Sequence, residues 1–291
     1  MIIDSHAHYA HASFSNTFRY LTWDREGYAL AEGGLEQLLE CLKDAGINCT
    51  IEPGISLASN EAVLALSRKY PDYIFPAVGV HPTRTFRERW RDRKKLIPLA
   101  ALPEVIAVGE TGLDYHYKRE DQHRFCQHMW FLYQLNLAWR VKKPVILHIR
   151  DAHADALRIL KIHPARRLGG VVHCFTGDRE AAEAYLDLGY HIGIGGALLQ
   201  KPERAEKLWE AVERMPLERI LLETDAPYVL PDCKEEIKPK QLRRARNSSL
   251  VLPAVAERIA QLKGISPEIV LETTARNDIR LFSLPLEPEQ N

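Results

Sequence analysis

The sequence is short of cysteine, of long apolar runs and of net charge, and each shortage excludes a class of protein. Its five cysteines include no CxxC pair, which argues against a disulfide framework and a thiolate zinc site. No stretch approaches about 18 consecutive apolar residues, so we expect no membrane-spanning helix. Lysine plus arginine and aspartate plus glutamate both total 39, so attraction to polyanions must come from local clusters of charge.

The N-terminus also lacks the basic segment and following apolar stretch that mark a secretory signal. This absence, together with thiols that are read as free, predicts a cytoplasmic protein. Hydrophobic residues make up 46% of the chain and charged residues 27%, which is typical of a globular enzyme rather than of a disordered chain. For the oligomeric state we expect a monomer.

Eight short apolar runs alternate with helical patterns along the chain. The runs are rich in valine and isoleucine, as expected for strands that are covered on both faces. Segments between them, such as 35–47, carry leucines at helical spacing and end near glycine or proline. The alternation predicts an α/β fold, a (β/α)8 TIM barrel, with a doubly wound open sheet as the alternative. The expected strands are residues 2–5, 47–54, 73–80, 105–110, 144–149, 169–175, 190–196 and 219–225.

Two segments lie outside this regular alternation, within what we predict to be one domain over residues 1–291. Residues 250–282 predict extra C-terminal helices that pack on the outside of the barrel. Residues 9–32 form a long inserted loop, and we expect it on the catalytic face because it follows the first strand. It is either a lid that stacks on a base or a loop that packs its own small core against the rim. Its aromatic residues are Phe14, Phe18, Tyr20, Trp23 and Tyr28.

Polar side chains recur where the expected strands end, which is where TIM barrels carry their catalytic groups. His6 and His8 are two residues apart on a strand and therefore point to the same face. Buried imidazoles and carboxylates at one rim are costly unless they are paired or bind metal. Such a donor set suits Zn²⁺, Mn²⁺, Fe²⁺ or Ni²⁺ better than Ca²⁺, and six ligands favour two metal ions over one tetrahedral zinc. The predicted ligands are His6, His8, Glu110, His148, His173 and Asp225.

These motifs resemble those of the TatD family of metal-dependent hydrolases, within the amidohydrolase-like barrel superfamily. The resemblance extends along nearly the whole chain, and a lone DxHxH motif would mark only the superfamily. It implies metal-dependent phosphodiester hydrolysis, as in a deoxyribonuclease, with two divalent ions whose identity (Zn, Mg, Mn, Fe or Ni) stays open. The stretches that carry it are "DSHAH" (4–8), "GVHP" (79–82), "GETGLDYH" (109–116), "LHIRDA" (147–152), "HCFTG" (173–177) and "LLETDAPY" (221–228).

The resemblance also implies a role for each ligand. His6 and His8 would bind one metal with Asp225 nearby, and His148 and His173 would hold the second. Glu110 would bridge the two ions, in the place where other amidohydrolases carry a carbamylated lysine. Asp225 and Glu110 are therefore the predicted catalytic residues, with Asp225 orienting or deprotonating the attacking water.

Two further residues are predicted to bind substrate. Arg150 follows His148 by two residues, and it either contacts a phosphate or pairs with Asp151 or Asp114. His81, after the third strand, either contacts a substrate phosphate or has a structural role. Glu223 either orients a ligand or belongs to a polar network in the barrel core.

The chain departs from the family pattern at two places besides its ligands. The inserted segment 9–32 would narrow the site, which favours short or terminal substrates over long DNA. The family's stretch after the last strand usually reads close to Arg-Asn-Glu-Pro, whereas residues 246–249 read Arg-Asn-Ser-Ser, which alters how that loop is anchored.

Local charge bears on the substrate. Residues 84–95 contain seven basic and two acidic residues, and residues 234–246 contain six basic and two acidic residues. Both segments follow barrel strands, so they either give the site a positive mouth for an anionic substrate or are solvated surface.

Three functional hypotheses follow. The first is a dinuclear metal-dependent phosphodiesterase or deoxyribonuclease that acts on DNA or nucleotide ends by attack of a metal-bound hydroxide. The second is a carbonyl-directed hydrolase of esters, lactones, amides or aminoacyl-tRNA that uses the same centre. The third, a binding protein without catalysis, is disfavoured by the complete ligand set.

Overall fold

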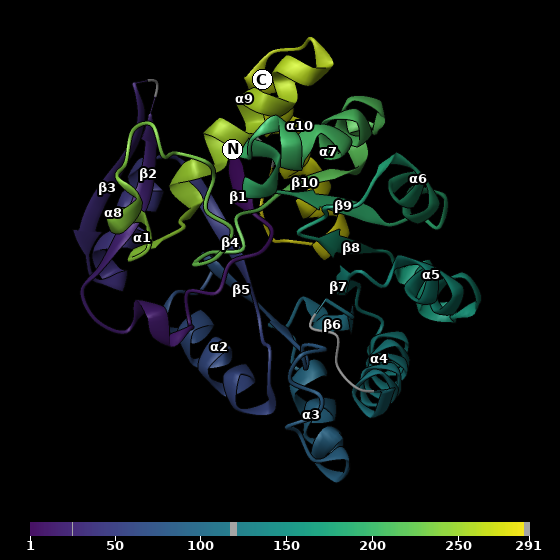
Figure 1. The fold of residues 1–291 in the computed structure, drawn as a ribbon. Coiled ribbons are helices and arrows are strands. Elements are labelled where there is room, and N and C mark those ends of the chain that lie inside the picture. The colour runs from purple at the N-terminus through teal and green to yellow at the C-terminus, as the bar shows by residue number, and fades with distance from the viewer. Residues whose placement is uncertain (25, 117–120, 288–291) are drawn as a thin grey trace.

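The computed structural model describes residues 1–24, 26–116 and 121–287 of the protein, and a barrel of eight parallel strands forms its centre (Figure 1). Each strand pairs with the next along the chain, so the prediction of a (β/α)8 barrel is confirmed. The eight strands are β1 (Ile2–Asp4), β4 (Ile47–Pro53), β5 (Ile74–Val78), β6 (Ala107–Asp114), β7 (Val145–Arg150), β8 (Gly170–His173), β9 (His191–Ile194) and β10 (Ile220–Leu222). Strand β6 continues past Glu110 to Asp114, four residues beyond its expected end, but all eight strands overlap the runs expected from the sequence.

The barrel closes where the chain leaves β1 and β10. The Ser5 amide donates to the Leu222 carbonyl at 2.9 Å, and Ala7 forms a parallel bridge with Ala226. An open sheet would leave the edges of its first and last strands unpaired, so these bonds exclude the doubly wound alternative.

Helices surround the strands in Figure 1, and their ends follow local sequence signals. Asp178 accepts a hydrogen bond from the Ala181 amide and caps the start of its helix, as expected for aspartate at an N-cap. None of the helices in the described part of the chain has the length and apolar character needed to cross a membrane. The helices are α1 (Leu35–Asp44), α2 (Leu57–Lys69), α3 (Leu96–Ala100), α4 (Asp121–Val141), α5 (His153–Ile162), α6 (Arg179–Asp187), α7 (Pro202–Arg214), α8 (Pro239–Leu242), α9 (Leu252–Lys263) and α10 (Pro267–Phe282).

The C-terminal helices differ in what they cover. Helix α9 packs against α7 and α10 outside the strands, as expected. Helix α10 instead joins the cluster inside the barrel, where Phe282 and Ala275 pack with Ile3, Ile146 and Leu221 of three strands. Helix α10 therefore covers the barrel end at which the strands begin and leaves the opposite end for the polar residues.

The inserted segment is a β-hairpin rather than a loop. Strands β2 (Phe18–Asp24) and β3 (Gly27–Gly33) pair antiparallel, and the short strand β11 (Ala245–Arg246) pairs parallel with β2. Figure 1 shows β2 and β3 on one flank of the barrel beside α8.

The hairpin packs into the main hydrophobic core on one side and into a small separate cluster on the other, which favours packing over a lid for residues 9–32. Phe14, Phe18 and Tyr20 are buried, and their rings follow one another from Tyr9 at centroid distances of 5.0, 4.9 and 5.8 Å. Leu21 packs on the other side of β2 in a separate cluster. These aromatic rings are used for packing, so they are not available to stack on a base.

The altered stretch after the last strand is anchored to this hairpin. The hydroxyl of Ser248, at the position where the family usually has glutamate, donates to the Leu21 carbonyl of β2 at 2.6 Å. The insertion and the departure at residues 246–249 are therefore parts of one structural unit.

Candidate metal centre

The first pair of predicted ligands follows β1. His6 and His8 lie on the same side of the chain, as their spacing requires, and their Nε2 atoms are 3.1 Å apart. His6 is fully buried and His8 is nearly so. The Tyr9 and Ala10 amides directly after His8 donate to the carboxylate of Glu52 at 2.7 and 3.0 Å, which fixes the backbone there.

Asp4 holds this stretch against the last strand of the barrel. Its buried carboxylate accepts hydrogen bonds from the Thr224 hydroxyl and the Ser249 hydroxyl, both at 2.6 Å, and from the His6 amide at 3.1 Å. Burial raises the pKa of Asp4 to about 6, against the opposing effect of these donors. The network brings the two ends of the sheet together directly beneath the histidines.

Asp225 completes the first group of donors. Its Oδ1 lies 3.3 Å from His8 Nε2 and 3.8 Å from His6 Nε2. Its φ of 54° is in the left-handed region, which costs a non-glycine residue about 1 kcal/mol or more. The Asp225 amide donates to the His6 carbonyl at 2.9 Å and its carbonyl accepts from the Tyr228 amide at 2.8 Å, so the surrounding backbone maintains this conformation.

A second group of donors lies on the neighbouring strands. His148 of β7 and His173 of β8 are paired in register, and His148 Nδ1 is 3.1 Å from His173 Nε2. His148 Nε2 contacts the Asp114 carboxylate at 3.1 Å, which orients its ring. Gly112 of β6 lies opposite His148, and a Cβ atom at Gly112 would be 2.1 Å from the His148 carbonyl oxygen. Only glycine allows β6 to approach this histidine so closely.

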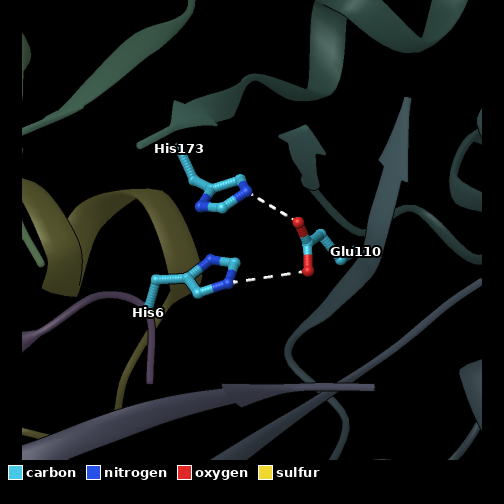
Figure 2. A group of neighbouring side chains, drawn as sticks. All are labelled: His6, Glu110 and His173. Carbon is cyan, nitrogen blue, oxygen red and sulfur yellow. Dashed lines mark ion pairs between the residues drawn. The ribbon is translucent and has the colours of Figure 1, made fainter. Parts of the chain in front are cut away.

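Glu110 stands between the two groups, and each of its oxygens faces a different one. Figure 2 shows one oxygen directed at His173 and the other at His6. Oε1 lies 2.6 Å from His173 Nε2 and 3.0 Å from His148 Nδ1, whereas Oε2 lies 3.7 Å from the Nε2 atoms of both His6 and His8. The carboxylate is 2% exposed, so these histidines are its main polar surroundings.

The spacing of the donor atoms fits metal coordination. A tetrahedral ion with metal–nitrogen bonds of about 2.0–2.1 Å separates neighbouring donors by roughly 3.3 Å. The contacts among His6, His8 and Asp225 span 3.1–3.8 Å, on either side of this value. Those among His148, His173 and Glu110 span 2.6–3.1 Å, so this second group would open slightly around an ion. Imidazole and carboxylate are also the donors that divalent transition metals prefer.

Protonation of the centre is set by burial and by the facing charges. Burial alone would raise the pKa of Glu110, but His81, His173 and His148 outweigh it and hold that pKa well below its usual range. Burial and the neighbouring His173 lower the pKa of His6 well below its ordinary value. The centre therefore keeps an ionised carboxylate beside a neutral imidazole, the state in which both bind a metal.

His8 and His148 behave differently from His6. Burial lowers the pKa of each, but Asp225 and Glu110 raise that of His8 to about 9, and Asp114 and Glu110 raise that of His148 to about 9. Without metal both rings carry a proton at neutral pH, and that proton must leave before the nitrogen can bind an ion.

The structure places the two predicted substrate residues at the same centre. His81 Nε2 lies 3.3 Å from Glu110 Oε1, and its Nδ1 contacts the Thr83 hydroxyl at 2.7 Å. Arg150 lines both cavities over the centre, and the carboxylates of Asp114 and Asp151 each contact a histidine, His148 and His116 respectively. The role of each in substrate binding remains a prediction.

Two cavities meet over the centre and share His148, His173, Asp225, Arg150 and Tyr228. The first, of about 350 Å³, adds Arg84 and Arg87 from the basic segment 84–95. The second, of about 620 Å³, adds Gln200, Arg204 and an apolar wall that includes Val229 and Leu230. The lining of neither includes a residue of 12–33, so the inserted hairpin is not a lid over them.

Sequence reasoning missed three residues that shape the centre. Glu52 and Asp4 also stand at or near strand ends, so the rule that located the ligands was capable of finding them. Tyr228 gave no such signal, because it lies in the irregular segment after β10. Glu223 accepts a hydrogen bond from the Cys174 amide and lies 3.9 Å from His173 Nδ1, so both interpretations of this residue stay open.

Comparison with known proteins agrees with this geometry. The chain is 38% identical over 252 residues to a "3'-5' ssDNA/RNA exonuclease TatD" of Edwardsiella piscicida, covering 87% of this chain and 94% of that protein. It is 39% identical over 213 residues to the "uncharacterized metal-dependent hydrolase YcfH" of Escherichia coli K12, covering 73% of this chain and 75% of that protein.

The fold is shared over its whole length with a solved structure. The crystal structure of YjjV, a TatD homologue from Escherichia coli K12, superimposes with a TM-score of 0.82 at 29% identity and covers 98% of each chain. The family model described as "TatD related DNase" matches residues 3–283, a range that contains all six predicted ligands. A barrel with imidazoles and carboxylates at one rim, these relatives and this match together assign the chain to the TatD-related DNase family.

Proposed function

We propose that the protein is a dinuclear metal-dependent phosphodiesterase, a deoxyribonuclease that acts on the ends of DNA or on nucleotides. The observation that carries the proposal is the position of Glu110, whose two oxygens face two separate histidine pairs. A single ion would use one side of this carboxylate, whereas a bridging role accounts for both.

The proposed ligands divide into two sets. His6, His8 and Asp225 would hold one ion, His148 and His173 would hold the other, and Glu110, which faces both groups, would be shared between them. When bound, such ions polarise a phosphoryl oxygen and lower the pKa of a water molecule. Membership of the family supports the use of divalent metal, and Zn, Mg, Mn, Fe and Ni are the candidate ions.

The chain's own residues supply orientation and charge. Asp225 is positioned by its backbone hydrogen bonds to accept the proton of the attacking water. Arg150, with Arg84 and Arg87 in the same cavity, places donors where a phosphate oxygen gains negative charge in the transition state. His81 contacts the substrate phosphate from the side of β5.

The arginines favour the nuclease over the carbonyl-directed alternative. A neutral ester or lactone does not need three guanidinium groups around its carbonyl, whereas a phosphodiester is an anion that binds them. The exonuclease names of the curated relatives point in the same direction. We further propose that residues 1–291 act as a single domain and as a cytoplasmic monomer.

Substrate and variant assays test the proposal together. We expect the metal-loaded protein to hydrolyse bis(p-nitrophenyl) phosphate and oligodeoxynucleotides, with little turnover of p-nitrophenyl acetate or a lactone. Glu110→Gln should abolish metal binding at one or both positions and the activity with it. The matched control is Glu104→Gln, which changes a surface carboxylate paired with Arg68 and should be silent. Turnover of the carbonyl substrates alone would overturn the proposal.

A further inference from the structure

A third cavity, of about 410 Å³, lies beside the inserted hairpin and takes no part in the proposed metal centre. Its walls come from the segment before β2, from both strands of the hairpin, and from the chain around β11. Guanidinium, hydroxyl and amide groups dominate its lining. The lining residues that matter here are Ser13, Asn16, Arg19, Glu32, Arg244 and Arg246.

The charge of this cavity is positive. Three arginines face one glutamate, and that glutamate, Glu32, is opposite Arg19 in the hairpin and pairs with it at 2.9 Å. Arg244 is exposed, and the buried Nε of Arg246 has no hydrogen-bond partner within the described residues. Guanidinium groups beside hydroxyls and amides are the usual surroundings of a bound phosphate.

A continuous row of side chains connects this cavity to the metal centre. Tyr228 lines both cavities over the centre, and its ring is 6.2 Å from that of His8 and 5.8 Å from that of His11. Its hydroxyl lies 3.4 Å from His11 Nε2, and His11 Nδ1 contacts the Ser13 hydroxyl of the third cavity at 2.9 Å. His11 therefore links the two places.

His11 also lies within the fields of arginines from both ends of this row. Burial and His8 lower its pKa first, and Arg84 of the first cavity and Arg246 of the third lower it further. The rim from Arg84 to Arg246 therefore carries positive charge with an aromatic side chain in its middle. Tyr228 is 46% exposed, so a base has access to its ring.

We propose that this rim is a second binding site for single-stranded nucleic acid, in which Tyr228 stacks on a base and Arg244, Arg246 and Arg19 bind the phosphates of the strand outside the metal centre. The inference rests on the proposed nuclease function and gives the inserted hairpin a role in binding the substrate. Stacking on an aromatic ring beside a basic groove binds single strands with little dependence on sequence. The hairpin, rather than restricting the enzyme to short substrates, extends its contact with longer ones.

The length of the substrate provides the test. A thymidylate dinucleotide reaches only the metal centre, whereas a thymidylate dodecamer also reaches the hairpin. For Arg244→Ala we expect KM for the dodecamer to rise about 3- to 10-fold and KM for the dinucleotide to stay unchanged. The salt dependence of dodecamer binding should become weaker, by about 0.7 in the logarithmic slope for one lost phosphate contact.

A second variant should change KM for the dodecamer in the opposite direction. Glu32→Gln removes the negative charge of the cavity and should lower KM for the dodecamer without affecting the dinucleotide. Arg68→Ala is the matched control, because Arg68 is an exposed, paired arginine in the last turn of α2, near the barrel end where the strands begin.

The outcomes separate this inference from the proposed function. Absence of any phosphodiester turnover by the metal-loaded wild type would sink the nuclease, whereas equal effects of Arg244→Ala on both substrate lengths, or none, would overturn the second site alone. Fluorescence anisotropy of a labelled phosphorothioate dodecamer measures the affinity of the second site for the strand without turnover. Equal affinities of the wild type and Arg244→Ala in that measurement would also overturn it.

Discussion

Replacing Gly112 by alanine tests whether the close approach of β6 to His148 sets the metal centre. The new Cβ would lie 2.1 Å from the His148 carbonyl oxygen, where ordinary contacts begin at 3.4 Å, so the strands must separate by about 1.3 Å. A displacement of about 1 Å at a catalytic group costs about 100-fold in rate. We therefore expect loss of about that factor in kcat on bis(p-nitrophenyl) phosphate, together with loss of metal held by His148.

Alanine at position 112 also introduces backbone strain, because the φ of Gly112 is +145°. A control variant must therefore separate the effect of this strain from that of the clash. Gly189 has a φ of +89° and no neighbour within 4 Å of a new Cβ, so Gly189→Ala carries strain without the clash. Gly189→Ala should lose about 1–2 kcal/mol in chemical denaturation from strain alone. Gly112→Ala should lose about 1–3 kcal/mol more, because it adds the clash. Only Gly112→Ala should lose phosphodiesterase activity and bound metal. The metal content is measured by inductively coupled plasma mass spectrometry. If it kept both at wild-type levels, the reasoning that ties this strand spacing to the centre would be refuted.

Three further predictions concern the centre. Metal affinity should fall as the pH drops below about 9, because the raised pKa values of His8 and His148 make protons compete with the ion, by about tenfold per pH unit for each proton released. Calorimetry in two buffers of different ionisation enthalpy counts these protons, and a count of zero at pH 7 would contradict the assignment. Chelation should abolish activity and lower the melting temperature, since a metal at 100 times its Kd contributes about 2.7 kcal/mol; recovery on adding Mn²⁺ or Zn²⁺, but not Ca²⁺, is the expected control. Glu52→Gln should cost about 1–3 kcal/mol and reduce kcat, because one of the Tyr9 and Ala10 amides behind His8 loses its acceptor. Stability and activity both unchanged in Glu52→Gln would show that this anchor is dispensable.

The clustering of the proposed ligands was predictable because two simple rules act together. The spacing of His6 and His8 fixes their common direction, and parallel strands that end at one rim bring Glu110, His148 and His173 to the same place. Both rules use only the local sequence and the order of the strands. The same rules do not assign contacts within the rim, which is why the position of His81 against Glu110 was not foreseen.

The inserted hairpin shows where sequence reasoning stopped. Its strands do not alternate cleanly, because Phe18 and Tyr20 face one core while the adjacent Leu21 faces another. Buried residues on both faces remove the period of two that marks a strand. Its partner β11 comes from far along the chain, and no local pattern reveals such a pairing.

The bonds of Asp4 have a consequence for the order in which the molecule is built. They join positions 220 and 245 residues apart, and the first proposed metal position likewise combines His6 and His8 with Asp225. During synthesis, contacts of such sequence separation cannot form until the last barrel strand has been made, and closing so long a loop has an entropic cost. A chain emerging from the ribosome would present its first two histidines long before it could complete a centre with them. Cleavage of nucleic acid would then begin only when β10 has joined β1, so a partly synthesised chain carries no nuclease activity.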